Sequence, residues 1–169
     1  NLTAEVEPYF QFYLDHYILP DGNFLYNKQD QVEAPLNAGV FLENSARAWD
    51  YARDLDALRR RMPALRRMAE YVRGRIAYSK SHFPASDPRH GLVWGSAEAD
   101  LGAPGDDYPE SHPYYYQNAA WTWRGFREHA RTLASAAAAH PDPALIEESR
   151  IFAAWAAELR ADVEASLAK

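Results

Sequence analysis

The sequence predicts an all-α fold of antiparallel helical hairpins, arranged as a single helical domain over residues 1–169. The main observation behind this prediction is that apolar residues recur every three or four positions through most of the chain. A second is that two breaks in this pattern are only a few residues long, so the flanking helices should be antiparallel neighbours. A third is that no stretch reads convincingly as a strand, although short strand-like pieces occur at 24–26 and 92–94.

Two helices are expected in the first part of the chain. The first covers residues 4–18 and ends at a Pro-Asp-Gly-Asn turn at 20–23. The second covers residues 33–52, because its apolar residues keep helical spacing and Pro35 suits a first helical turn. The asparagine at position 37 lies on the apolar side of this helix, where it can face a lumen or bond within a helix interface.

The clearest helical pattern runs from residue 54 to residue 79. Asp54 is a suitable N-cap, and the apolar stripe continues in register through Pro63, which predicts one kinked helix instead of two. The arginines at 59–61 and 66–67 are interpreted as the solvated outer face of this helix.

A long segment rich in proline and glycine follows, over residues 79–116. It is far longer than the usual connection of about 4–6 residues, and long ordered loops are commonly functional. Two more helices are expected at 117–139 and 143–168, separated by a break at 140–143.

Tight joints therefore alternate with long loops along the chain. The joints lie at 53–54 and 140–143, and the loops lie at 19–33 and 79–116. If successive helices alternate in direction, both long loops gather on one side, which is the expected working face. This asymmetry indicates part of an (α/α) toroid or an α-solenoid.

The composition excludes several classes of function. Lys and Arg number 18 against 24 Asp and Glu, a net charge of −6, which makes nucleic acid a poor partner. The chain has no cysteine, so disulfides and zinc–thiolate sites are excluded. No apolar run approaches the length of a membrane span, and no membrane partner is expected.

The first residue is Asn1, which suggests a processed chain or a piece of a longer one. Cytoplasmic and exported locations stay equally open.

Three stretches resemble the six-hairpin glycosidases. The stretch 54–72, with Pro63 at mid-course and an Ala-Glu-Tyr-Val ending, resembles a helix of that family. The stretch 90–100 resembles its Gly-Leu loop followed by acidic residues, and 116–134 resembles the next inner helix, which opens with asparagine and aromatic residues. The order and spacing match over residues 35–168.

The resemblance implies an (α/α)6 toroid that hydrolyses glycosidic bonds in a carbohydrate substrate. That fold has twelve helices in six hairpins, whereas this chain has room for about five. It therefore resembles a segment of the barrel, and the remainder of the parent chain is an expected partner.

The best catalytic candidates lie in the long loop. From residue 91 to residue 123 there is no Lys or Arg, yet five carboxylates occur. Crowded carboxylates raise one another's pKa, as a general acid near neutral pH requires, and glycoside hydrolysis needs two carboxyl groups at the bond. We expect Glu98, Asp100 and Asp107 to be catalytic; the competing interpretation is a solvated or calcium-stabilised loop.

Sugar binding also needs flat apolar rings and hydrogen-bonding side chains. The residues expected to bind substrate are Trp94, His112, Tyr115, Asn118, Trp121, Asn37 and Gln29. The sequence shows no EF-hand, zinc-ligand spacing or phosphate loop, so no metal and no cofactor is expected.

Two other functions stay open. A toroid-type polysaccharide lyase could use His112, Tyr114–Tyr116 and Asn118, but it would want a cation for the substrate carboxylate, which Arg124 or Arg89 would have to supply. A non-catalytic helical module that binds a glycan or a protein would explain the short length.

Overall fold

The computed structural model describes residues 3–27, 32–33, 35–95 and 116–169. In this part the chain is all-α, as predicted. The five helices are α1 (Thr3–His16), α2 (Leu36–Ala52), α3 (Leu55–His82), α4 (Tyr116–Ala139) and α5 (Pro143–Leu167). A small antiparallel pair, β1 (Leu25–Asn27) and β2 (Val32–Glu33), lies between α1 and α2.

Two boundaries differ from the prediction. Residues 32–33 pair with β1, so α2 begins at Leu36 after Pro35 and not at residue 33. The reason is steric, because the residue before a proline is disfavoured in the α region. The strand-like piece at 92–94 forms no strand, whereas the piece at 24–26 largely does, as β1.

The α2–α3 joint has the predicted form. Arg53 ends α2 in the left-handed conformation, with φ of 52°, and donates its N–H to the carbonyl oxygen of Trp49. Asp54 then caps α3, where its carboxylate accepts the N–H of Ala57 at 2.9 Å. The helix continues unbroken through Pro63, which faces solvent.

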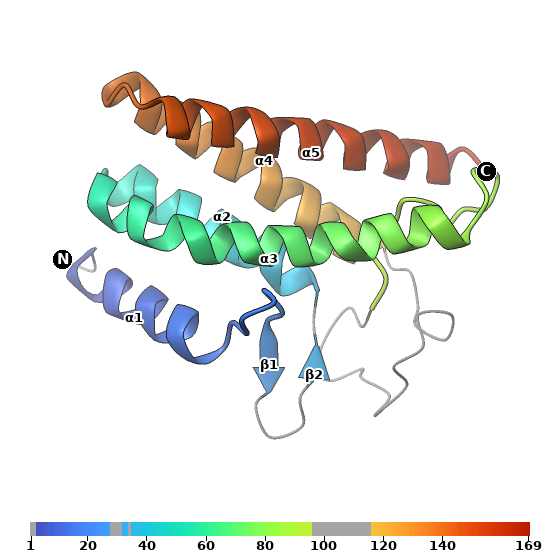
Figure 1. Cartoon of the computed structure of the whole chain (residues 1–169), viewed down its shortest axis with the longest axis horizontal. Coiled ribbons are helices and arrows are strands. Elements are labelled where there is room, and N and C mark those ends of the chain that lie inside the picture. The colour runs from blue at the N-terminus through green and yellow to red at the C-terminus, as the bar shows by residue number, and fades with distance from the viewer. Residues whose placement is uncertain (1–2, 28–31, 34, 96–115) are drawn as a thin grey trace.

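The two hairpins stack on each other in parallel. Side-chain contacts between α2 and α4 join residues 81 to 86 positions apart, such as Asp50 with Arg131 and Trp49 with Ser135. Contacts between α3 and α5 join residues 78 to 85 positions apart. A nearly constant separation is the mark of helices that run in the same direction. Figure 1 shows the α4–α5 hairpin above the α2–α3 hairpin, with α1 beneath.

Glycines set how closely the two hairpins approach. A Cβ atom on Gly125 of α4 would lie 2.6 Å from the Cα of Gly39 in α2. A Cβ atom on Gly39 would lie 2.6 Å from the backbone nitrogen of Thr122 and would press on the carbonyl oxygen of Trp121. The backbones of α2 and α4 therefore touch at this crossing, which only glycine permits at both positions.

The assignment of the arginine cluster to a solvated face is wrong for Arg61. Its side chain is 2% exposed, stacks 4.9 Å from the ring centroid of Phe10 and pairs with Glu7 of α1 at 3.1 Å. Position 61 lies three residues after the buried Leu58, so it falls on the inner stripe of α3. Among the helices that the structure describes, none is long and apolar enough to cross a bilayer.

Candidate functional site

A buried arginine near the end of α3, Arg75, contacts the segment that follows the helix. Arg75, 4% exposed, donates from Nη2 to the hydroxyl of Tyr71 at 2.6 Å and from Nη1 to the carbonyl oxygen of Trp94 at 3.1 Å. Its guanidinium also stacks 3.9 Å from the ring centroid of Trp94, which is a close cation–π contact. Arg75 thus anchors the segment 92–95. We call Arg75, Tyr71 and the segment 92–95 the loop root.

Asn118 holds the same segment from the side of α4. It is fully buried, and its Nδ2 donates to the carbonyl oxygen of Gly95 at 2.9 Å. Gly95 has φ of 127°, and a Cβ atom there would lie 2.8 Å from the ring of Pro35. The segment before α2 and the segment after α3 therefore meet at the loop root. This agrees with the expectation that the two long loops lie on one side.

Replacing Asn118 with aspartate should destabilise the protein by about 2–3 kcal/mol, because the donor to Gly95 is lost and a charge is buried in its place. The matched control is Gln117→Glu, which adds the same charge one residue earlier at an exposed position in the first turn of α4. Urea denaturation of both variants checks this. Equal stability of the two variants would show that Asn118 does not hold the loop root.

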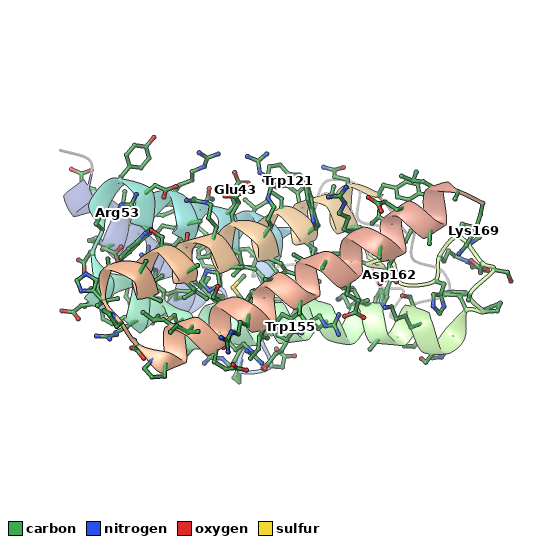
Figure 2. The ribbon with its side chains drawn as sticks, turned by 90° about the horizontal axis from the view of Figure 1, so that it is seen from above. Glu43, Arg53, Trp121, Trp155, Asp162 and Lys169 are labelled. Carbon is green, nitrogen blue, oxygen red and sulfur yellow. The ribbon has the colours of Figure 1, made fainter. Side chains whose placement is uncertain are left out.

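Trp121 lies one turn further along α4, next to an ion pair. The guanidinium of Arg124 stacks 5.5 Å from the ring centroid of Trp121 and pairs with Glu43 of α2 at 2.5 Å. Figure 2 shows Glu43 and Trp121 together at one edge of the bundle. Arg124 is thus engaged by Glu43, while a partly exposed tryptophan ring faces the edge.

Asn37 lines a groove between α1 and α2. This groove has a volume of about 790 Å³ and is here called the α1–α2 groove. Its lining residues are Glu5, Val6, Tyr9, Phe10, Tyr13, Tyr17, Phe24, Asn37, Val40, Phe41 and Asn44.

The structure therefore divides the predicted binding residues. Trp94, Asn118 and Trp121 lie at or beside the loop root, and Asn37 lies in the α1–α2 groove. Six other predicted residues lie outside the described residues, so their placement stays a prediction: Glu98, Asp100, Asp107, His112, Tyr115 and Gln29.

Sequence reasoning missed Arg75 and Tyr71. The signal was present, because position 75 falls three residues after Val72 and four before Ser79, both of which are buried. An arginine on a buried stripe needs a specific partner, and here the partners include a tyrosine hydroxyl and a loop carbonyl. In the part of the chain that the structure covers, no three acidic or histidine side chains gather as metal ligands would.

Comparison of the chain with known protein families, with curated proteins and with solved structures gives no match.

Proposed function

We propose that the chain is part of a carbohydrate-active enzyme whose active site forms at the loop root. The observation that carries the proposal is the meeting of Asn118 in the first turn of α4 and Pro35 before α2 at Gly95, the last described residue before a stretch whose sequence holds five carboxylates. Helix N-termini carry partial positive charge, which favours nearby carboxylates in their ionised form. Glycoside hydrolysis needs one ionised carboxylate and one carboxyl group that stays protonated.

The stacked hairpins support a toroid-like role for this segment. Parallel inner helices, each followed by an antiparallel outer helix, are the repeating unit of an (α/α) ring. In this proposal α2 and α4 are inner helices, and α3 and α5 are outer helices. The loop root then lies at the mouth of the ring.

A lyase remains the second candidate. Elimination from a uronate needs a cation near the substrate carboxylate, and Arg124, whose side chain is 42% exposed beside Trp121, is the cation that could supply it, since no Lys or Arg occurs from 91 to 123. Lyase activity would appear as a rise in ultraviolet absorbance from the unsaturated product. A non-catalytic module, the third candidate, would bind glycans without turnover.

The test of the hydrolase proposal is the amide series Glu98→Gln, Asp100→Asn and Asp107→Asn, assayed by release of reducing ends from a panel of polysaccharides. Loss of a catalytic carboxyl group should lower kcat/KM about 10²–10⁴-fold without changing the free energy of unfolding. The matched control is Asp56→Asn, since Asp56 is an exposed carboxylate in the first turn of α3, far from the loop root. Full activity in all three loop variants would refute hydrolysis by these residues.

A further inference from the structure

A row of tyrosine rings lines the α1–α2 groove on the side of α1. Tyr9, Tyr13 and Tyr17 follow one another at four-residue spacing, and successive ring centroids lie 4.7 Å and 4.9 Å apart. The ring of Tyr9 is 59% exposed, and the other two are half-buried. Flat rings that are partly exposed offer an apolar surface on which a ligand can stack. The row is therefore a platform for more than one ring of a ligand.

The side of the groove on α2 carries amide groups. Asn37 and Asn44 both line the groove, and they lie seven residues apart on one face of α2. The Nδ2 atom of Asn37 is buried and has no hydrogen-bond partner among the described residues. Because a buried donor without a partner is costly, a ligand that brings an acceptor oxygen to Asn37 gains free energy. The groove therefore favours a ligand that has hydroxyl groups as well as apolar faces.

The groove is also negatively charged. Glu5, in the first turn of α1, is a carboxylate among the lining residues, and none of the described residues that line the groove is a lysine or an arginine. The faces of aromatic rings add to this negative potential and attract cations. A ligand with a positive charge is favoured here, whereas an anionic sugar such as a uronate is repelled.

We propose that the α1–α2 groove binds a short oligosaccharide of basic amino sugars. Each pyranose ring has an apolar face for the tyrosine row and hydroxyl oxygens for Asn37 and Asn44, and each unacylated amino group is a cation that can pair with Glu5. The groove volume of about 790 Å³ lies within the range of small-ligand sites. This inference rests on the proposed function for the carbohydrate class of the ligand, and it adds the kind of sugar. The groove binds the sugar and breaks no bond.

The test compares three β-1,4-linked tetrasaccharides that differ only at C2. Glucosamine carries an ammonium group there, N-acetylglucosamine carries an amide and glucose carries a hydroxyl. Isothermal titration calorimetry of the 169-residue chain at about 0.15 M salt gives the three dissociation constants. The glucosamine tetramer should bind at least about tenfold more tightly than either of the others, because it alone can form a charge-assisted hydrogen bond with Glu5.

Three variants locate the binding in the groove. Glu5→Gln keeps the size of the side chain and removes its charge, so the three dissociation constants should become similar. The matched control is Asp15→Asn, which removes the same charge from an exposed position of α1 outside the groove lining and should keep the preference for glucosamine. Asn37→Ala removes the buried donor and should weaken binding of the glucosamine tetramer about fivefold.

Several results would overturn the proposal. Equal binding of the three tetrasaccharides would mean that the groove does not select an amino sugar, and binding of none would mean that it holds no carbohydrate of this kind. An equal loss of preference in Glu5→Gln and Asp15→Asn would trace the attraction to the net charge of −6 and not to the groove. Calorimetry detects binding whether or not the chain cleaves a sugar, so this proposal and the proposed enzyme activity fail separately.

Discussion

Lowering the pH from 7 to 3 should remove about 5 kcal/mol of unfolding free energy through His129 alone. The imidazole is 1% exposed, with the ring of Phe152 edge-on at 4.6 Å. Burial, assisted by the positive charge of Arg61, lowers the pKa of His129 from its ordinary 6.5 to about 3. Above pH 6.5 the imidazole is neutral in both states. Below it only the unfolded chain takes up the proton, so stability falls until the pH reaches the folded-state pKa.

The measurement is the free energy of unfolding by urea at pH values from 7 to 4. His129→Gln removes the titrating group, so its stability should fall less steeply than that of the wild type, by about 1.4 kcal/mol per pH unit below pH 6. The matched control is His140→Gln, which makes the same substitution at an exposed histidine in the α4–α5 joint. Comparing slopes removes any loss of packing that the substitution itself causes. A His129→Gln profile parallel to the wild type would show that His129 is not buried in neutral form.

Replacing Gly39 with alanine should cost about 3 kcal/mol or more, because the new methyl group meets backbone atoms of α4 that cannot rotate away. The two helices must move apart, which also loosens the neighbouring contacts between Glu43 and Arg124 and between Asp50 and Arg131. Stability measured by urea denaturation at 25 °C gives the size of the effect.

The matched control is Gly74→Ala in α3. Nothing lies within 4 Å of a Cβ atom at Gly74, and the position is exposed in the middle of a helix. Alanine there should stabilise the protein by about 0.5–1 kcal/mol through helix propensity. If Gly39→Ala behaved like Gly74→Ala, the close crossing of α2 and α4 would be wrong.

Helices could be predicted because their signals are local. The three- and four-residue period, the cap at Asp54 and the break after residue 139 all act within one or two turns. The start of α2 was predicted three residues too early, because the helical spacing was followed back across Pro35 into residues that pair with β1. The long loop was recognised by its composition alone.

The candidate site could be predicted only in part. Asn118 and Trp94 were predicted to bind sugar, which stays a prediction, and the structure shows that both hold the loop root. Arg75 was not selected, because sequence spacing indicates which face a residue occupies but not which side chain meets it. Arg61 was predicted on the wrong face because its charge was taken to indicate solvent exposure, although its position falls on the apolar stripe of α3.

By itself the sequence determined the all-α class, the number of helices in the described part and the end at which the tight joints lie. These depend on periodicity, caps and turns, which neighbouring residues decide. Only the tertiary structure decided that α2 and α4 run in parallel with touching backbones, that a buried arginine supports the loop, and that α1 leaves a groove beside it. The crossing of α2 and α4 depends on contacts between residues more than 80 positions apart, and the contact of Arg75 with Trp94 spans 19 positions; no local pattern specifies either set of partners.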